Sequence, residues 1–286
     1  MDIQKDYNYY LRIERAMSPN TVASYCSDVE FFLGYYRGRL SDLLPEHIEE
    51  YILSREFLSK RSQARLLSSL RSFCTWLVME KILSDNPCDR VDAPKLGRYL
   101  PDVLSQEEVI RIIESVGTET WLEARDRALL EVLYGCGLRV SEAVALKLSD
   151  ISPDDGFVRV IGKGDKERLV PLGEMAADAL RKYVEMRPFE FAAAEYVFLN
   201  RYGNPLSRVS AFTIARNRTL AAGISKTVSP HTFRHSFATH LIENGADIRL
   251  VQEMLGHESV STTEIYMHVN TATWHGAILS NHPRNK

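Results

Sequence analysis

Four residues with the chemistry of a phosphate site recur between residues 230 and 269 of the 286-residue chain. His231 and Arg234 are three positions apart, and His257 and Tyr266 follow them. On a helix, a spacing of three places the first two side chains on one face. A planar guanidinium matches a phosphate, an imidazole can exchange protons, and a phenol can act as a nucleophile. This stretch therefore predicts one wall of an active site that works on a phosphate.

Two further cations lie upstream and could form the opposite wall. Arg139 follows the Gly-Cys-Gly turn of residues 135–137 at a predicted helix start, where its side chain can reach into a cleft. Lys163 lies in the glycine-rich turn 162–166, from which a long cation can swing towards a leaving group. Together with the four residues downstream, they make a set of six candidates.

Each of the six also has an ordinary structural interpretation. The two arginines could be surface ion-pair partners, and His231 could cap a helix terminus. His257 could be a buried, hydrogen-bonded histidine, while Lys163 could be a solvated turn residue, with Lys166 equally suited to the catalytic role. Tyr266 is one of 13 tyrosines, and a phenol with a pKa of about 10 needs a base or cationic neighbours to become nucleophilic. Taken singly, none of the six is decisive.

The order of the six residues along the chain is more informative than any one of them. It runs Arg139, Lys163, His231-x-x-Arg234, Gly256-His257 and Tyr266. This order resembles that of the tyrosine recombinase (integrase) family. Within it the chain is most similar to the bacterial Xer recombinases, with closing residues nearer the XerD than the XerC type. The stretches that carry the resemblance are SPNTVASYCSDVEFF, YGCGLRVSEAVAL, VIGKGDKERLVPL, HTFRHSFATHLIENGADIRLVQEMLGHESVSTTEIYMHV and the terminal HPR, which together cover nearly the whole chain.

The resemblance implies a catalytic role for each residue. Tyr266 would attack a DNA phosphate and form a 3′-phosphotyrosyl link. Arg139 and Arg234 would hold the non-bridging oxygens and stabilise the pentavalent transition state, assisted by His257. Lys163 would protonate the departing 5′ oxygen.

The same resemblance gives His231 the role of acid–base partner of the phenol and Glu142 a supporting role in the cleft. Because a phosphotyrosyl bond preserves the energy of the phosphodiester, the reaction needs no ATP, metal or other cofactor. The expected partner is double-stranded DNA with a dif-like site, bound by a homo- or hetero-tetramer that could include a XerC-like paralogue. The expected role is resolution of chromosome dimers during segregation, with a DNA translocase as a further partner.

The elements that must position these residues are predicted to be mainly α-helical, with one small β-hairpin. Apolar spacing and capping residues predict four or five helices in residues 1–92, including one after Ser18-Pro19, one from Pro45 and a long basic helix from Ser59. By resemblance this is a helical, SAM-like core-binding domain. The prolines of residues 93–103 do not continue a helix and predict a linker.

Residues 104–286 are predicted to form the catalytic domain, so that the two domains make a clamp around DNA. A capping box at Ser105 and a long helix over residues 121–134 precede a hairpin of residues 157–161 and 167–172. Helices from His231 and Asp247 follow, and a third from Ser261 holds Tyr266. A last helix, around residues 273–279, would dock either on a neighbouring subunit or on its own domain.

Bulk composition is ordinary for a soluble globular protein, with 45% hydrophobic and 26% charged residues. No apolar run is long enough to cross a membrane, and the N-terminus lacks the apolar core of a signal peptide, so the expected location is the cytoplasm. The four cysteines are widely spaced, which predicts reduced thiols and no zinc site.

The net charge of the chain is −3, but two stretches are poor in acidic residues and locally basic. Residues 201–235 contain six Lys or Arg and no Asp or Glu, and residues 55–71 contain five against Glu56 alone. Either stretch by itself would be an ordinary solvated face, whereas two in separate halves of the chain favour a clamp around a polyanion. The predicted DNA contacts are Arg61, Arg65, Arg71, Arg208, Arg216 and Arg218.

Three other functions use similar residues. A phage or mobile-element integrase shares the catalytic set but often carries an additional N-terminal arm-binding domain, for which no room exists before Tyr7. A DNA-binding protein that has lost catalysis is disfavoured by the intact set of six. A type IB topoisomerase-like relaxase would act as a monomer, and recombination between paired sites distinguishes it from a recombinase.

Overall fold

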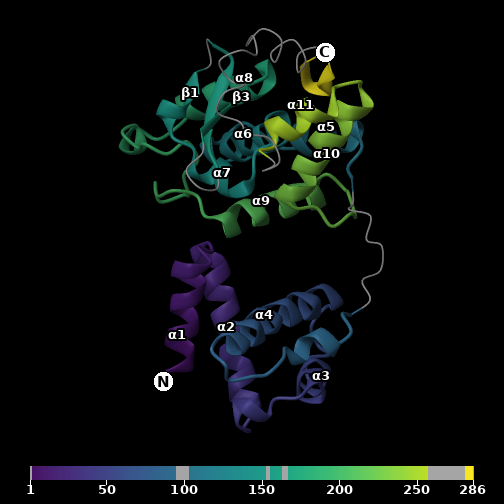
Figure 1. Ribbon diagram of the computed structural model, residues 1–286. Coiled ribbons are helices and arrows are strands. Elements are labelled where there is room, and N and C mark those ends of the chain that lie inside the picture. The colour runs from purple at the N-terminus through teal and green to yellow at the C-terminus, as the bar shows by residue number, and fades with distance from the viewer. Residues whose placement is uncertain (1, 95–102, 153–154, 163–166, 257–280, 286) are drawn as a thin grey trace. The chain divides into compact units, whose positions relative to one another are not determined.

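The computed structural model describes residues 2–94, 103–152, 155–162, 167–256 and 281–285 (Figure 1). The chain divides into two compact units, residues 1–100 and 101–286. Both are mainly helical, and the second contains one small antiparallel sheet, as the sequence predicts. The finer prediction, in which residues 93–103 form a linker, stays a prediction because residues 95–102 lie outside the described part.

The regular elements of the N-terminal unit are all helices over its described residues. Its elements are α1 (Ile3–Tyr9), the π-helix η1 (Tyr10–Glu14), α2 (Pro19–Tyr35), η2 (Leu40–Asp42), α3 (Pro45–Leu53), α4 (Lys60–Met79) and η3 (Pro87–Arg90). The predicted caps are confirmed, because the Ser18 hydroxyl accepts from the Thr21 amide and the Ser59 hydroxyl from the Ser62 amide. These caps start α2 and α4, which contact each other.

The core of this unit includes an aromatic group that lies between α1, η1 and α4. The ring of Tyr7 contacts those of Phe73 and Trp76 at centroid distances of 5.1 and 5.4 Å. The apolar stripe predicted for α4 is buried as expected. The apolar spacing of Tyr7, Tyr10, Leu11 and Ile13 predicts one amphipathic opening helix. In the structure α1 ends at Tyr9 and a π-helical turn follows, so Ile13 is 59% exposed.

Seven α-helices are described in the C-terminal unit. They are α5 (Gln106–Glu114), α6 (Trp121–Gly135), α7 (Val140–Ala145), α8 (Glu174–Glu185), α9 (Arg208–Ala221), α10 (Pro230–Glu243) and α11 (Ile248–Met254), with the short turns η4 (Leu148–Asp150), η5 (Phe189–Phe191) and η7 (Pro283–Asn285). The predicted caps at Ser105, Ser229 and Asp247 are confirmed. The helix predicted from Ser261 lies outside the described residues. No helix in the described ranges has the length and apolar character of a membrane span.

The sheet has three antiparallel strands in the order β1 (Ile151–Ser152), β2 (Phe157–Ile161) and β3 (Glu167–Pro171). The predicted hairpin is confirmed, with Val158 opposite Val170 and Arg159 opposite Leu169. The short β1 was not expected, because two residues are too few for a periodic signal. The residues that join β2 to β3 include Lys163 and fall outside the described part of the chain.

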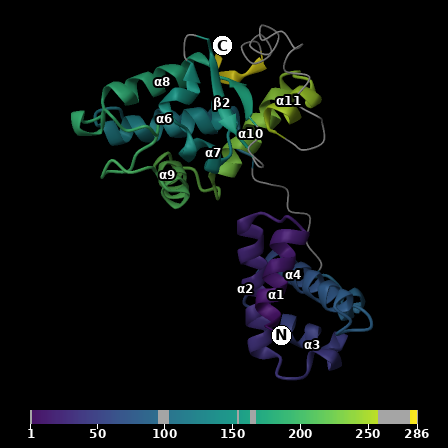
Figure 2. The same cartoon turned by 60° about the vertical axis from the view of Figure 1, so that its left-hand side comes forward.

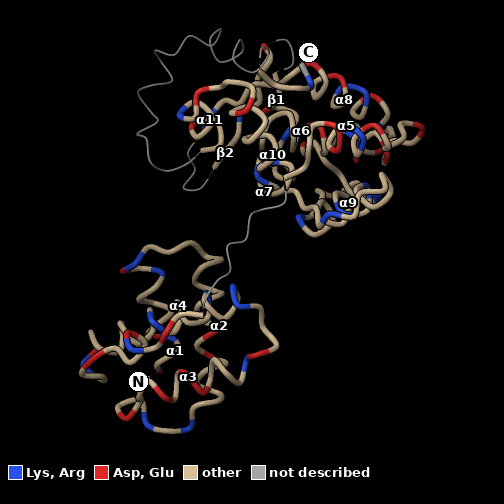
Figure 3. The backbone as a smooth tube through the Cα atoms, turned by 90° about the vertical axis from the view of Figure 1, so that its right-hand side faces the viewer, with Lys and Arg blue, Asp and Glu red and all other residues tan. Residues whose placement is uncertain are grey.

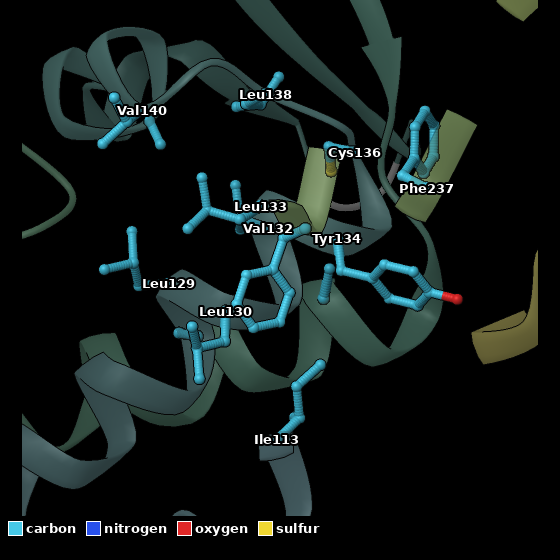
Figure 4. Close-up of a cluster of buried hydrophobic side chains, with 14 of the residues drawn as sticks. Ile113, Leu129, Leu130, Val132, Leu133, Tyr134, Cys136, Leu138, Val140 and Phe237 are labelled. Atoms are coloured by element: carbon cyan, nitrogen blue, oxygen red, sulfur yellow. The ribbon is translucent and has the colours of Figure 1, made fainter. Parts of the chain in front are cut away.

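Helix α6 is the centre of this unit and contacts α5, α7, α8, α9 and α10 (Figures 1 and 2). Its side chains Leu129, Leu130, Leu133 and Tyr134 point in several directions into the core (Figure 4). The turn that follows, residues 135–137, is buried. Gly137 has a φ of +59° and a Cβ there would collide with the ring of Phe237, so only glycine fits.

The last described residues dock on their own unit. The Arg284 guanidinium pairs with the buried Glu131 of α6 and, at 3.4 Å, with Glu114 of α5. The Asn244 side chain donates to the Asn281 carbonyl at 2.7 Å. We call residues 281–285 with these partners the C-terminal anchor. The predicted helix around residues 273–279 lies outside the described residues, so its docking partner stays open.

Candidate active site

Helix α7 presents Arg139 and Glu142 together because they occupy its N-terminal turn. Arg139 is the N-cap residue, and the Glu142 carboxylate reaches back to accept from the Arg139 backbone N–H at 2.7 Å. Glu142 Oε1 also accepts from Arg139 Nη1 at 2.9 Å. A carboxylate is stabilised at a helix N-terminus by the unpaired amides there. The predicted supporting role of Glu142 therefore has a local basis: it orients Arg139.

Arg234 approaches the same carboxylate from α10. It lies one turn into this helix, which the Ser229 cap begins, and it is buried. Its Nη1 donates to the Gly137 carbonyl at 2.6 Å, and its Nη2 donates to the Leu255 carbonyl at 2.5 Å. The Arg234 Nη1 to Glu142 Oε2 distance is 3.8 Å. Two of the six predicted residues, 95 positions apart in sequence, thus converge on one acidic group.

A third guanidinium at this site was missed by the sequence interpretation. Arg168 of β3 donates to both oxygens of Glu142, each at 2.9 Å, and its Nε donates to the Met254 carbonyl at 3.0 Å. The alternation of exposed and buried positions along β3 could have revealed this residue. Arg168 and Val170 face the core, while Leu169 between them is 43% exposed. A charged residue in phase with buried positions indicates a partner inside.

The C-terminal end of α11 completes the cluster. The carbonyls of Met254, Leu255 and Gly256 each accept one hydrogen bond, from Arg168, Arg234 and Arg139 respectively. The last carbonyls of a helix lack intrahelical partners and carry partial negative charge, so cations are favoured there. Gly256 ends the helix with a φ of +67°. We call Arg139, Glu142, Arg168 and Arg234 the arginine cluster.

The arginine cluster has more positive than negative charge. Three guanidinium groups surround one carboxylate, and burial alone would disfavour the charged form of Glu142. Hydrogen bonds and charge from Arg168, together with hydrogen bonds from Arg139, nevertheless hold the pKa of Glu142 below its usual value. Burial and the nearby charge of Arg139 lower the pKa of Arg234 to about 10, so it stays charged at neutral pH. The surplus charge suits an anion such as a phosphate diester.

Of the remaining predicted catalytic residues, the structure describes only His231. His231 lies in the first turn of α10, as predicted, and its exposed ring is 6.4 Å from that of Phe212 on α9. His257 directly follows Gly256 in sequence. Lys163, His257 and Tyr266 lie outside the described residues, so their convergence with the cluster stays a prediction.

The predicted DNA-binding arginines of the N-terminal unit include two that bond within that unit. Arg65 pairs with Asp28 at 2.5 Å, and Arg71 donates to the Cys88 carbonyl at 2.9 Å. Arg61 is exposed. Each guanidinium has five N–H donors, so an arginine that has partners within the unit can still bind a phosphate. Their contact with DNA stays a prediction.

The predicted DNA-binding arginines of the C-terminal unit lie on α9, which carries separate blue segments in Figure 3. Arg208 and Arg216 are exposed. Arg218 donates through two nitrogens to the buried carboxylate of Asp126, at 3.0 and 2.7 Å. The contacts of Arg218 support a structural role at least as well as the predicted DNA contact.

Metal binding finds no support in the part of the chain that the structure describes, where no three His, Cys, Asp or Glu side chains are grouped to hold an ion. The four cysteines are free thiols. The described part of the site contains three arginines, which can bind a phosphate through charge and paired N–H donors.

A two-domain helical protein with such a phosphate site fits the class of enzymes that cut and rejoin DNA. Comparison with known proteins defines the class further. Residues 102–273 match the model of the phage integrase family, and residues 5–81 match that of the phage integrase N-terminal SAM-like domain. The chain therefore belongs to the phage integrase family and is a tyrosine-type site-specific recombinase, an enzyme that breaks and rejoins DNA strands.

Individual relatives agree over nearly the full length. The chain is 43% identical to tyrosine recombinase XerD of Oceanobacillus iheyensis, covering 98% of each chain. It is 44% identical to tyrosine recombinase XerD of Chlorobaculum tepidum, covering 96% of this chain and 94% of the relative. Among solved structures, XerA recombinase is 29% identical over 99% of each chain, with a TM-score of 0.51. XerH bound to a palindromic difH substrate has a TM-score of 0.70 at 23% identity, covering 91% of this chain and 78% of the other, which supports the fold.

Proposed function

We propose that this recombinase resolves chromosome dimers by strand exchange at a dif-like site, through a 3′-phosphotyrosyl intermediate. The observation that carries the catalytic part is the arginine cluster, in which three guanidinium groups share one carboxylate. The likeness to XerD recombinases over nearly the whole chain supports the cellular role. It also favours this role over that of a phage or mobile-element integrase.

In the proposed reaction, the Tyr266 oxygen attacks the scissile phosphorus while His231 takes the phenol proton. The bond from phosphorus to the 5′ oxygen breaks, and Lys163 supplies the proton that this oxygen needs. Arg139 and Arg234, with His257, stabilise the added negative charge on the non-bridging oxygens. A 5′ hydroxyl of the partner duplex then gives its proton to Lys163 and attacks the phosphotyrosine. The phosphodiester is restored, and Tyr266 leaves as its oxygen takes the proton back from His231. No bond energy is lost, so neither ATP nor a metal ion is required.

The assembly around this chemistry belongs to the same proposal. Two DNA sites would be held by a tetramer, formed either by this chain alone or with a XerC-like paralogue, and a DNA translocase would activate it in the cytoplasm. The exposed arginines Arg61, Arg208 and Arg216, with Arg65, Arg71 and Arg218, would bind the phosphate backbone. Such contacts set affinity and position, whereas base contacts set the sequence.

The nucleophile can be tested with nicked DNA that traps the covalent adduct. We expect Tyr266→Phe to bind DNA with unchanged affinity and to form no adduct, because the substitution removes only the attacking oxygen. The measurement is the yield of a protein–DNA band on a denaturing gel, beside the dissociation constant. An adduct at normal yield would show that another residue is the nucleophile. Recombination between paired sites would then separate a recombinase from a monomeric relaxase.

A further inference from the structure

Arg168 occupies an unusual position for an arginine. It lies at an inward-facing position of β3 and its side chain is 7% exposed. Burying a guanidinium is unfavourable unless it is paired and hydrogen-bonded. Strand β3 could present a hydrophobic residue here, as it does with Val170 two residues later. The burial of a cation at this position therefore indicates a role other than stabilising the sheet.

The hydrogen bonds of Arg168 join three elements of the site. Two of its nitrogens bind the two oxygens of Glu142 on α7, and its third binds the Met254 carbonyl at the end of α11. In sequence, these elements lie next to three proposed catalytic residues: Arg139 begins α7, the residues before β3 include Lys163, and His257 follows Gly256. A side chain that fixes the distances among β3, α7 and α11 can therefore set the geometry of the whole site.

Arg168 also changes how strongly the Glu142 carboxylate holds its other two partners, Arg139 and Arg234. Glu142 is the partner of Arg139 at 2.9 Å and lies 3.8 Å from Arg234. Without Arg168, a buried carboxylate with fewer partners would draw these two guanidinium groups towards itself more strongly. Because Arg168 satisfies both oxygens of Glu142, Arg139 and Arg234 keep donors and charge for a phosphate. Among the three, Arg139 is the most accessible, with 35% of its side chain exposed.

We propose that Arg168 is a positioning residue for strand cleavage: it acts through Glu142 and the Met254 carbonyl and does not touch the DNA. This inference rests on the proposed function, because it assigns Arg139 and Arg234 to the scissile phosphate. It goes beyond that proposal by adding a residue to the machinery and by stating how the residue acts. The expected consequence is a defect in the cleavage rate at saturating DNA, with DNA affinity nearly unchanged.

The test measures single-turnover formation of the covalent adduct on nicked DNA at saturating protein. We expect Arg168→Met to slow adduct formation roughly 100-fold, as expected when a reacting group is displaced by about an ångström. Arg168→Lys keeps the charge but cannot bind both Glu142 oxygens and the carbonyl at once, so we expect at least a roughly tenfold loss. The dissociation constant for DNA should change by less than about threefold in both variants.

A second substitution tests whether Arg168 acts through Glu142. In the double variant Arg168→Met with Glu142→Gln, no unpaired carboxylate competes for Arg139 and Arg234, since replacing both partners removes the uncompensated charge. We expect the double variant to cleave about tenfold faster than Arg168→Met alone. An equal or lower rate in the double variant would overturn the proposed route through Glu142.

Arg125 provides a matched control in the same unit. It is also buried, it pairs with Asp126 at 2.6 Å and it donates to the Leu199 carbonyl at 3.0 Å. Arg125→Lys should therefore lower stability as Arg168→Lys does, yet leave the rate at saturating DNA unchanged. If Arg168→Lys slows cleavage no more than Arg125→Lys does, the inference is wrong. Absence of any adduct with the unmodified protein would instead count against the proposed function itself.

Arg168→Met could fail to fold, because it removes one partner of a buried pair. In that case Arg168→Lys and the double variant carry the test, since neither leaves Glu142 as an isolated buried charge. Thermal unfolding of each variant, measured before the kinetics, identifies the folded ones. Wild-type cleavage by a folded Arg168→Lys variant would overturn the inference.

Discussion

Two ion-pair clusters of the C-terminal unit have opposite ratios of charge. In the arginine cluster, three guanidinium groups meet the single carboxylate of Glu142. In the C-terminal anchor, the single guanidinium of Arg284 meets two carboxylates, those of Glu131 and Glu114. Each cluster contains a buried carboxylate, and both join α-helices to another segment. The two clusters differ in how much charge each of them leaves unpaired.

The comparison indicates how a binding site can be distinguished from a structural ion pair. The C-terminal anchor is self-contained, because Arg284 and the buried Glu131 compensate each other. The arginine cluster keeps a surplus of positive charge, and helix carbonyls at residues 254–256 take up only part of its donors. A surplus that is held rigidly in a protein interior is preorganised for an incoming anion. The first cluster should therefore govern catalysis, and the second should govern stability.

The largest expected effect is on catalysis by the arginine cluster. Arg139→Ala or Arg234→Ala should each slow adduct formation by roughly 10²–10³-fold, the usual cost of removing one donor to a transition-state anion. The measurement is single-turnover cleavage of nicked DNA by variants whose circular dichroism matches that of the unmodified protein. A folded variant that cleaves at the normal rate would remove its arginine from the proposed mechanism.

A smaller effect, on stability, is expected at the C-terminal anchor. Arg284→Ala leaves the buried Glu131 carboxylate without its cation, which should lower the free energy of unfolding by about 3–5 kcal/mol. Urea denaturation measures this change. Arg181→Ala is the control, because its pair with Asp178 is exposed and should contribute less than about 1 kcal/mol. Equal losses in the two variants would contradict a structural role for the anchor.

The smallest effect concerns the pH dependence of the same anchor. His282 packs on the rings of Tyr134 and Phe237, and burial lowers its pKa to about 3, against about 6.5 in an unfolded chain. Above pH 6.5 the imidazole is neutral in both states. As the pH falls from 6.5 towards 3, only the unfolded chain takes up the proton, so unfolding becomes easier by up to about 1.4 kcal/mol per pH unit.

We expect His282→Asn to reduce this slope between pH 7.5 and pH 5, as measured by urea denaturation at both values. His240, whose pKa is also lowered by burial, contributes in the same direction and stays in the variant. Part of the slope should therefore remain. A slope identical to that of the unmodified protein would show that His282 does not titrate as its environment implies.

The helical framework was largely predictable because its signals are local. The caps at Ser18, Ser59, Ser105 and Ser229 were correctly predicted, since a hydroxyl that satisfies an amide three residues later leaves a short sequence signature. The hairpin was predictable for the same reason. The π-helical turn after Tyr9 was not, because the apolar spacing of residues 7–14 also fits a regular helix.

The site was only partly predictable. Arg139, Glu142 and Arg234 were singled out in the sequence, and the structure brings them together. Arg168 does not stand out in VIGKGDKERLVPL, because a hairpin with a catalytic lysine accounts for this stretch and only the inward phase of the arginine marks it. The pairing of Arg218 with Asp126 could not be predicted from the sequence either, since the two residues are far apart along the chain.

By itself, the sequence determined the class of enzyme, the order of its six proposed catalytic residues and most helix starts. These features depend on residue identity and on contacts within a few positions, which a linear pattern records. Only the tertiary structure decided which arginines share Glu142, and that the carbonyls of residues 254–256 accept from all three of them. The physical reason is that a buried charge takes its partner from whichever element the packing brings near, and strand β3 and helices α7, α10 and α11 meet only when the unit folds.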